Sequence, residues 1–240
     1  MIKNTAIVLA GGSGSRMNSD IPKQYIEVNG KPLLAYSLII MDKSPVIDEI
    51  ILVARENDIE FCQKEIVAKF NINKVTRIVK GGSERYWSVL EGLKAASGEC
   101  VWIHDGARPF VSNKTIDTCI EEAKEHKAIV VGVPVKDTIK VIDDSNNIVD
   151  TPNRSVLWAV QTPQTFDYNI LLNAYEDAFK SGFYGTDDAM LVERIGHKVK
   201  MVEGSYNNIK ITTKGFGHGV GLSQYGANAL AKQKKTYEEI

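Results

Sequence analysis

The sequence predicts an α/β fold in which a doubly wound, mostly parallel sheet carries helices on both faces and a β-arm protrudes. Short segments rich in Val and Ile alternate with helical patterns over the first 133 residues, which predicts parallel strands joined by helices. The apolar segments show little polar–apolar alternation, as is typical of strands covered on both faces. A chain of 240 residues has room for one large α/β domain or two small ones.

The alternation defines each element in turn. Strands are expected over 6–9, 49–53, 76–79, 100–103 and 129–133. Helices are expected between them, over 33–41, 58–70, 83–96 and 112–126. Ser83 and Ser112 stand at helix starts, where a serine side chain accepts a hydrogen bond from a free backbone N–H. The helix over 83–96 is expected to bury Trp87, Leu90 and Leu93. In such sheets ligands bind beyond the carboxyl ends of the strands.

A break in this rhythm over 134–158 predicts the protruding arm. Two apolar segments, 135–142 and 148–149, flank an Asp-, Ser- and Asn-rich turn signal over 143–147. Because an isolated hairpin is marginally stable, we expect this β-arm, about 135–157, to pack against the same arm of a second subunit. Further along we expect helices over 167–181 and from 186, followed by strands over 198–202 and 208–213.

Charge and hydropathy exclude several classes of protein. A net charge of −1 argues against broad binding of nucleic acid or anionic membranes, so any phosphate recognition is local. The apolar runs are too short for a membrane span, and the N-terminus enters a strand too short for a signal-peptide core. We therefore expect a cytoplasmic protein with no nucleic-acid and no membrane partner. Cys62, Cys100 and Cys119 lack metal-like spacing and are expected to be reduced core thiols.

The first loop has the composition of a phosphate-binding site. Ile7-Val-Leu-Ala-Gly-Gly-Ser-Gly-Ser-Arg-Met17 runs from a buried strand into glycines whose backbone N–H groups can turn inward and bind anions. Arg16 and Lys23 add positive charge where a triphosphate would lie. The loop is not a Walker A motif, which needs G-K-[ST], and Met17 replaces the third glycine of a dinucleotide fingerprint. An ordinary glycine-rich turn between a strand and a helix is the plain alternative.

Five motifs in order, covering residues 5 to 213, resemble those of the 2-C-methyl-D-erythritol 4-phosphate cytidylyltransferase family. After the first loop they are Gly81-Gly-Ser-Glu-Arg85 with Ser88, His104-Asp-Gly-Ala-Arg-Pro109, Val133-Pro-Val-Lys-Asp-Thr138 followed by Arg154 and 157–164, and Asn208-Ile-Lys210-Ile-Thr212. The resemblance implies a Rossmann-like nucleotidyltransferase fold. It also implies transfer of a cytidylyl group from CTP to 2-C-methyl-D-erythritol 4-phosphate in the non-mevalonate isoprenoid pathway.

Two other functions stay open at the level of sequence. Gly11 stands where the family usually has alanine, and it brings the first loop nearer to the ribitol-5-phosphate cytidylyltransferases. The segments 134–138 and 157–158 favour the methylerythritol enzyme. A hypothesis of another class is a catalytically silent nucleotide-binding or cell-wall-associated protein.

The resemblance also implies roles for individual residues. The nucleotide is assigned to Ala10, Gly11, Gly12, Gly14, Gly81, Gly82, Ser83, Ser88 and Gly106. The polyol phosphate is assigned to Asp105, Arg108, Thr138, Arg154, Thr162, Thr186 and Lys210, and Arg154 is expected to reach in from the partner of a homodimer. The catalytic cations are expected to be Arg16, Lys23, Arg154 and Lys210.

Asp105 is the candidate ligand for Mg²⁺. It follows an apolar strand, and a hard carboxylate oxygen at a strand end can hold Mg²⁺ together with phosphate oxygens and water. The plain alternatives are that Asp105 caps the next element or pairs with Arg108. For Lys210 the plain alternative is a solvated residue on an edge strand.

The segment after Thr213 departs from this family, so we expect a cytidylyltransferase domain over 1–213 and an atypical glycine-rich tail over 214–240. Residues 214–233 resemble the GxGHGVGxSQYGA motif of the stage II sporulation protein D family, which are lytic transglycosylases acting on peptidoglycan. The upstream part that carries the general acid of those enzymes is missing, so the resemblance implies no glycan cleavage here. A natural or assembly-made gene fusion, a deliberate fusion and a fortuitous tail are the three interpretations.

Overall fold

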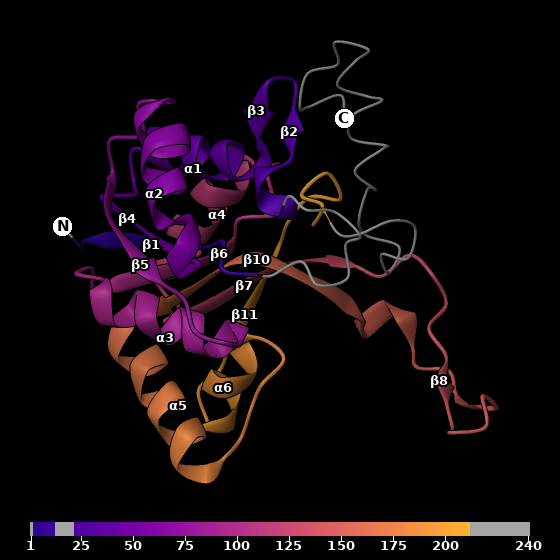
Figure 1. The fold of residues 1–240 in the computed structure, drawn as a ribbon. Helices are drawn as coiled ribbons and strands as arrows, with labels where there is room; N and C mark the ends of the chain where they lie inside the picture. Colours follow the sequence, from indigo (N-terminus) through magenta and orange to yellow (C-terminus); the bar gives the residue numbers. More distant parts are fainter. Residues whose placement is uncertain (1, 13–21, 212–240) are drawn as a thin grey trace.

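A seven-stranded sheet with the order β11-β7-β10-β6-β1-β4-β5 forms the centre of the protein (Figure 1). The computed structural model describes residues 2–12 and 22–211. The strands of this sheet are β1 (Asn4–Leu9), β4 (Glu49–Ala54), β5 (Val75–Lys80), β6 (Cys100–Asp105), β7 (Ala128–Pro134), β10 (Trp158–Asp167) and β11 (Lys200–Glu203). Neighbouring strands are parallel except at β10, which runs antiparallel to β6 and β7. The mostly parallel sheet and its first five expected strands are confirmed.

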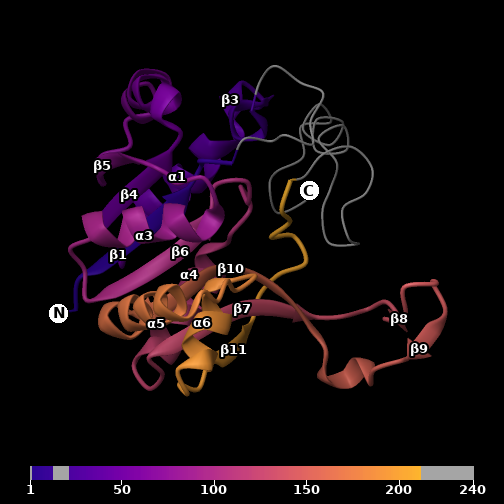
Figure 2. The same cartoon turned by 60° about the horizontal axis from the view of Figure 1, so that its bottom comes forward.

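Helices cover both faces of the sheet (Figures 1 and 2). One layer holds α1 (Leu33–Lys43), α2 (Ile59–Phe61), the π-helix η3 (Cys62–Ala68) and α4 (Asn113–Ala123). The other holds α3 (Arg85–Ala95), α5 (Tyr168–Ser181) and α6 (Asp188–Arg194). Ala6 and Val8 of β1 pack toward the first layer and Ile7 toward the second, because successive side chains of a strand point to opposite faces.

Short elements complete the described chain. They are η1 (Lys23–Tyr25), β2 (Glu27–Val28), β3 (Lys31–Pro32), η2 (Glu56–Asp58), β8 (Val141–Ile142), β9 (Ile148–Asp150) and η4 (Arg154–Val156). In the described ranges no helix combines the length and apolar character needed to cross a membrane. The three cysteines are free thiols, two of them fully buried, as the sequence predicts.

Two helices differ from the expectation. The helix expected over 58–70 becomes a π-helix from Cys62 onward. The helix expected to start at Ser83 starts at Arg85 instead, with no side-chain cap. The physical reason is that the N–H of Gly81 still donates to the carbonyl of Ala54 at 2.8 Å, which continues the strand ladder before the helix can begin. Ser112, in contrast, caps α4 as expected by accepting from the N–H of Thr115 at 3.1 Å.

The α3 face is also less buried than expected. Leu93 is fully buried, whereas Trp87 and Leu90 are half-buried. Trp87 instead stacks on Phe179 of α5, with ring centroids 4.4 Å apart. The exposed ring face is therefore covered by a second helix of the same layer rather than by the sheet.

The ten-residue strand β10 was not expected from the sequence, and it occupies a central position in the sheet. A proline inside an apolar segment argues against a central strand, since proline cannot donate to the ladder. The strand accommodates Pro163 through a cis Thr162–Pro163 peptide bond and a register shift between Val160 and Gln164. The strand expected over 208–213 does not form in its described part, 208–211.

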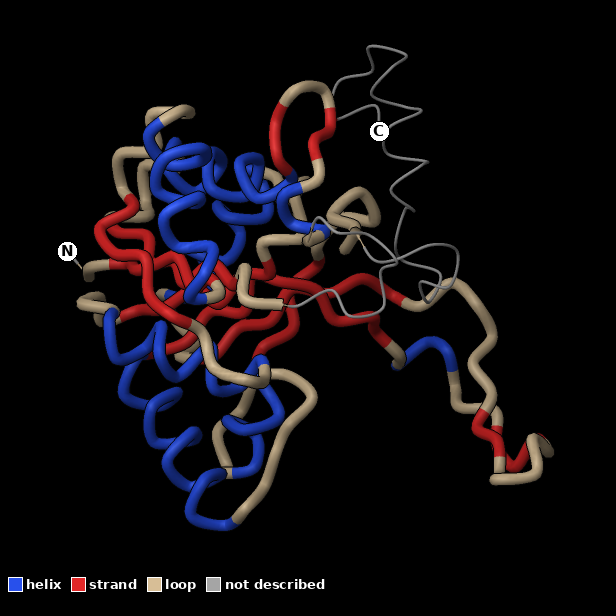
Figure 3. The backbone as a smooth tube through the Cα atoms, viewed as in Figure 1, coloured by secondary structure: helices blue, strands red, loops and turns tan. Residues whose placement is uncertain are grey.

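The β-arm is confirmed as an antiparallel hairpin of β8 and β9 that projects away from the sheet (Figure 3). Asp143 closes its turn, because Oδ1 accepts from the N–H groups of Ser145 and Asn147 at 2.9 and 2.8 Å. Apolar side chains cover its surface and are exposed to between 40% and 72%: Ile139, Val141, Ile142, Ile148, Val149 and Val156. The arm therefore has no core of its own within one subunit.

Candidate active site

The glycine segments after β1 and β5 lie side by side at the carboxyl ends of the parallel strands. A Cβ added to Gly11 would lie 3.5 Å from Ser88 Oγ and 4.0 Å from Gly81 Cα. The loop after β6 joins them, since the N–H of Gly106 donates to the carbonyl of Leu9 at 2.9 Å. Three segments far apart in the sequence thus meet at one edge of the sheet, where ligands bind in folds of this kind.

Gln24 fixes the start of the first loop. Its Nε2 donates to the carbonyls of Ala10 at 2.7 Å and Gly12 at 3.2 Å, and its side chain is buried. A Cβ at Gly12 would meet no atom of the described residues within 4 Å, so the described part of the fold leaves this backbone uncovered. Lys23 precedes Gln24 in η1 and is therefore anchored next to the loop. Gly14 and Arg16 lie outside the described residues.

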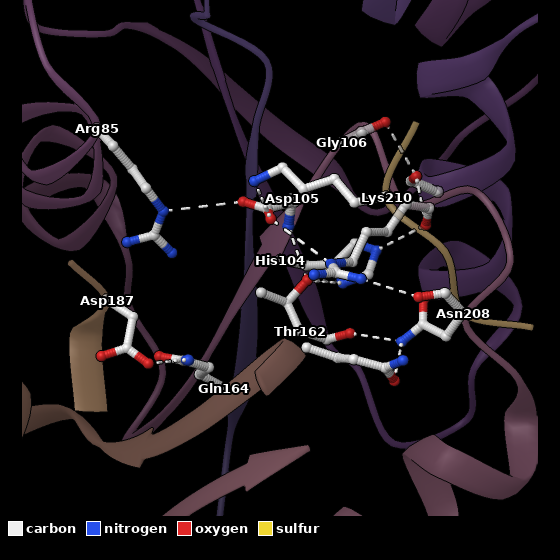
Figure 4. Close-up of polar contacts among 12 residues, drawn as sticks. Arg85, His104, Asp105, Gly106, Thr162, Gln164, Asp187, Asn208 and Lys210 are labelled. Carbon is white, nitrogen blue, oxygen red and sulfur yellow. Dashed lines mark hydrogen bonds and ion pairs between the residues drawn. The ribbon is translucent and has the colours of Figure 1, made fainter. Parts of the chain in front are cut away.

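Among the residues that the structure describes, three cations surround Asp105, at the end of β6 (Figure 4). Lys210 Nζ lies 2.8 Å from Oδ2, Arg108 Nε lies 3.6 Å from the same oxygen, and Arg85 Nε lies 3.8 Å from Oδ1. Burial opposes ionisation of this carboxyl, but the charges of Lys210, Arg85 and Arg108 outweigh it and hold the pKa of Asp105 well below its usual range. The cluster therefore keeps a permanent carboxylate and an excess of positive charge.

His104 holds the Asp105 backbone through Thr162. The N–H of Asp105 donates to Thr162 Oγ1 at 3.1 Å, and this hydroxyl lies 3.0 Å from His104 Nδ1. His104 Nε2 lies 3.1 Å from the carbonyl of Arg108, an acceptor, so Nε2 carries the proton. Burial lowers the pKa of His104 to about 4, so the ring is neutral at pH 7 and Nδ1 accepts from the Thr162 hydroxyl. The threonine proton is thereby committed to the histidine.

Asn208 joins the last motif to the sheet and explains why this segment is not a strand. Its fully buried Nδ2 donates to the carbonyl of Thr162 at 2.9 Å and to Gln161 Oε1 at 3.3 Å. The backbone carbonyl of Asn208 accepts a hydrogen bond from Arg108 Nη1 at 2.9 Å. These contacts turn the backbone toward β10 and place Lys210, two residues further on, beside Asp105.

Other residues assigned from the sequence lie elsewhere. Thr138 and Arg154 are exposed on the arm, and Arg154 donates to the carbonyl of Lys136 at 2.6 Å. Thr186 is exposed just before α6, with Oγ1 3.8 Å from Met190 Sδ. Gly82 and Ser83 are exposed at the start of α3. The structure thus brings Asp105, Arg108, Thr162 and Lys210 together and leaves the arm residues apart.

Sequence reasoning missed several members of this polar network. Gln164 Oε1 accepts from the N–H groups of Asp188 and Ala189 at 3.2 Å each, and its Nε2 donates to Asp187 at 2.8 Å. Arg85 and His104 stood within recognised motifs but received no role. The available signal was a polar side chain inside an otherwise apolar strand, because a buried polar group needs a partner.

Asp105 alone could hold Mg²⁺ only together with substrate phosphates and water. Among the described residues no group of three or more His, Cys, Asp and Glu side chains could form a metal cage. Mg²⁺ is commonly held by one or two carboxylates together with substrate phosphates and water. Asp105, ionised at a strand end and next to the glycine loops, fits that mode.

The fold and the site define a nucleotide-binding α/β protein of the Rossmann-like nucleotidyltransferase class. A family model described as IspD, 2-C-methyl-D-erythritol 4-phosphate cytidylyltransferase, matches residues 4–215. The enzyme of that name from Caldanaerobacter subterraneus subsp. tengcongensis is 49% identical over 211 residues, which is 87% of this chain and 93% of the relative. The one from Clostridium acetobutylicum is 50% identical over 211 residues, which is 88% of this chain and 92% of the relative.

A solved structure supports the same relationship. The 4-diphosphocytidyl-2C-methyl-D-erythritol synthase of Anaerococcus prevotii aligns with a TM-score of 0.82 and 37% identity, covering 96% of this chain and 99% of that one. The chain belongs to the 2-C-methyl-D-erythritol 4-phosphate cytidylyltransferase family and is a nucleotidyltransferase. The resemblance inferred from the five motifs is confirmed.

Proposed function

We propose that this chain transfers the cytidylyl group of CTP to 2-C-methyl-D-erythritol 4-phosphate, using the residues gathered at the carboxyl edge of its sheet. An oxygen of the substrate phosphate forms a bond to the α-phosphorus of CTP, and the bond from that phosphorus to the pyrophosphate oxygen breaks. The products are CDP-methylerythritol and pyrophosphate. The observation that carries the proposal is the meeting of the glycine segments at 11–12 and 81–82 with the cationic cluster at Asp105.

The nucleotide is proposed to bind across the two glycine segments. The backbone N–H groups of the first loop would face the phosphates, since open backbone favours anions. Gly106, whose own N–H donates to the Leu9 carbonyl, would let the loop after β6 pack closely beside them. The second segment and the start of α3 would take the base. The residues assigned to the nucleotide remain Ala10, Gly11, Gly12, Gly14, Gly81, Gly82, Ser83, Ser88 and Gly106. The support is the Gly12 backbone, which the described part of the fold leaves uncovered, and the close approach of Gly11 to Ser88.

Positive charge is proposed to do most of the chemical work. Substrate phosphate oxygens are already ionised at neutral pH, so the reaction needs no general base. Lys23 and Arg16 are assigned to the α-phosphate and the leaving group, and Lys210 to phosphate on the opposite side. Removing one preorganised charge of this kind typically costs about 10²-fold in rate.

Asp105 is proposed to hold Mg²⁺ together with the phosphates of CTP. The bound ion would neutralise phosphate charge, as it does in other phosphate-binding sites. Lys210 occupies Oδ2 of this carboxylate at 2.8 Å, so binding of the nucleotide would draw Lys210 from the carboxylate toward phosphate.

The polyol phosphate is proposed to bind between two subunits of a cytoplasmic homodimer. Arg108, Thr162 and Thr186 would contact it from one subunit, and Thr138 and Arg154 from the arm of the partner. The support is the exposed apolar surface of the arm and the hydrogen bond that holds Arg154 to the Lys136 carbonyl of the arm. Because the Thr162 proton is committed to His104, this hydroxyl would serve as an acceptor.

Pyrophosphate release from CTP and Mg²⁺ tests the proposed function. Methylerythritol 4-phosphate and ribitol 5-phosphate are offered separately, with no acceptor as the control. Release with methylerythritol 4-phosphate alone is expected. Release with ribitol 5-phosphate alone would assign the other polyol. Silence with both would support the catalytically silent alternative, and unchanged release by Lys23→Ala would remove that lysine from the mechanism.

The division into a domain over 1–213 and a tail over 214–240 is also a proposal. The family match ends at residue 215, and the tail lies outside the described residues. Its likeness to the stage II sporulation protein D family is a hypothesis drawn from the sequence. Deletion of 214–240 is expected to leave pyrophosphate release intact. Retention on peptidoglycan that is lost with the deletion would instead indicate a cell-wall role for the tail.

A further inference from the structure

Arg85 is held by a buried carboxylate that takes no part in the proposed reaction. Its Nη1 and Nη2 donate to the two oxygens of Asp188 at 3.0 and 2.7 Å, a bidentate pair. Asp188 is fully buried, whereas the Arg85 side chain is one-third exposed. Tyr175 adds a hydrogen bond from its hydroxyl to Asp188 Oδ1 at 2.5 Å.

The same guanidinium faces Asp105 with its remaining nitrogen. Arg85 Nε lies 3.8 Å from Asp105 Oδ1, which is longer than a hydrogen bond. The other oxygen of Asp105 is taken by Lys210 at 2.8 Å. Arg85 lies between the carboxylates of Asp188 and Asp105. If Arg85 were released from Asp188, its planar guanidinium could therefore pair with Asp105 instead.

We propose that Asp188 is a positioning residue for the nucleotidyl transfer, which acts through Arg85 to keep Oδ1 of Asp105 accessible. By occupying both terminal nitrogens of Arg85, Asp188 prevents a second bidentate pair with Asp105. Oδ1 then stays available to the Mg²⁺ that accompanies CTP. The inference rests on the proposed function, because it takes Asp105 as the group that receives the nucleotide's cation.

Strand β10 connects the Arg85–Asp188 pair to the rest of the site. Thr162 holds the backbone of Asp105, and Gln164, two residues further along the same strand, holds the backbone of Asp188 at 3.2 Å. Both carboxylates are therefore fixed relative to one strand. Arg85 spans the gap between them as a rigid cation, and its pKa is raised because the charges of Asp188 and Asp105 outweigh the effect of its burial.

Asp188→Asn is the decisive variant because it frees Arg85 without leaving a buried charge unpaired. Arg85→Ala would do the opposite and strand the fully buried Asp188. Binding of CTP is measured by calorimetry at several Mg²⁺ concentrations. We expect Asp188→Asn to weaken Mg²⁺-dependent binding about 10-fold, the lower range for groups that orient a metal ligand, with the loss reduced at high Mg²⁺.

A double variant separates competition from simple loss of structure. In Arg85→Met with Asp188→Asn the competing guanidinium is gone, so CTP binding is expected to return close to the wild-type value. If the Arg85–Asp188 pair only joined α3 to α6, Asp188→Asn would lower the melting temperature without any Mg²⁺-dependent change in CTP binding. CTP binding would then not recover in the double variant. Asp177→Asn is the matched control, because it breaks the exposed Arg194–Asp177 ion pair of the same helical layer.

Outcomes for the wild-type protein keep the two proposals distinct. A wild-type protein that neither binds CTP nor releases pyrophosphate contradicts the proposed function. An active wild type with an Asp188→Asn variant that binds CTP equally well at every Mg²⁺ concentration overturns the role of Asp188. Should Asp188→Asn fail to fold, Tyr175→Phe decides the question: a weaker loss with the same Mg²⁺ dependence supports the proposal, and unchanged binding contradicts it.

Discussion

At the residue scale, buried polar side chains set the geometry of the exposed ones. His104 is fully buried and contacts no solvent, yet its two ring nitrogens fix Thr162 and the carbonyl of Arg108. Thr162 in turn fixes the backbone of Asp105. A neutral imidazole suits this position because one nitrogen must donate and the other must accept. The backbone position of Asp105 thus depends on a residue that has no exposed surface of its own.

This neutral histidine makes the protein sensitive to mild acid. Burial lowers the pKa of His104 from 6.5 to about 4, so below pH 6.5 the unfolded chain takes up a proton that the folded chain refuses. The free energy of unfolding should therefore fall as the pH drops from about 6.5 to about 4, by at most about 1.4 kcal/mol per pH unit from this group. Urea unfolding at pH 7.5, 6.0 and 5.0 measures the effect.

His104→Gln is the control for that measurement. Glutamine retains a donor for the Arg108 carbonyl but does not titrate, so the variant is expected to be less stable with a shallower pH dependence between 6.5 and 5. Burial opposes ionisation of Glu49, but hydrogen bonds from Ser97, Thr5 and Thr76 outweigh it and lower the pKa of Glu49 to about 2. Glu49 therefore adds to the loss of stability only below about pH 4.5. Equal slopes for the two proteins would show that His104 does not cause the acid sensitivity.

At the element scale, the segment between β5 and α3 is shaped by close packing. The Gly81 N–H extends the strand ladder, and Gly82 then passes so close to Trp87 that a Cβ would lie 2.1 Å from the tryptophan Cβ. Trp87 cannot move away freely, because its ring stacks on Phe179. Only glycine allows α3 to begin here, which places Ser88 beside the first glycine loop.

Gly82→Ala is therefore expected to destabilise the protein. Overpacking of a fixed neighbour costs about 1–3 kcal/mol in free energy of unfolding. The matched control is Gly12→Ala, whose Cβ would meet no atom of the described residues within 4 Å and whose effect on stability should stay within about 0.5 kcal/mol. Denaturant unfolding compares the two. Equal stability losses would mean that the segment adapts and that Trp87 does not restrict it.

At the scale of the whole molecule, the arm is the part that one subunit cannot stabilise alone. Its two short strands and η4 leave apolar side chains exposed, Ile148 of β9 to 62% and Val156 of η4 to 72%. A contiguous exposed apolar surface commonly marks an interface. If two arms pack together, Arg154 of each subunit is carried toward its partner.

Charges placed on the arm should separate the subunits. Ile148→Asp with Val149→Asp is expected to convert a dimer into monomers, because each buried carboxylate would have to be desolvated without a partner. Sedimentation velocity reports the mass directly. Ile2→Asp, at a residue 61% exposed outside the arm, is the control and should leave the mass unchanged. A wild-type protein that sediments as a monomer would refute the arm interface.

Mixing two inactive variants tests whether the active site is shared. Lys23→Ala and Arg154→Ala should each lose activity, and Arg154→Ala should retain CTP binding. In a mixed dimer one of the two sites has both residues intact. Random exchange of subunits is then expected to restore about a quarter of the wild-type activity, given two-fold symmetry. No recovery after demonstrated exchange would place Arg154 within its own subunit's site.

The sequence by itself predicted the sheet strands β1, β4, β5, β6 and β7, the main helices between them and the arm, because apolar periodicity and turn signals are local properties of the chain. Its motifs also indicated the family. It also pointed to Asp105 and Lys210 through their motifs. It did not predict β10, because Pro163 lies inside that strand and proline is rarely found in a central strand. It also predicted a strand over 208–213 whose described part, 208–211, is irregular.

Only the tertiary structure decided which side chains share a site. Asp105, Lys210 and Asp188 are each more than 20 residues apart in sequence, and no local pattern states that Arg85 lies between the two carboxylates. That arrangement follows from strand order, which sets Thr162 and Gln164 beside β6 and α6. Local sequence fixes what each segment can form, whereas long-range pairing in the sheet fixes which charges meet, and the proposed chemistry depends on the charges.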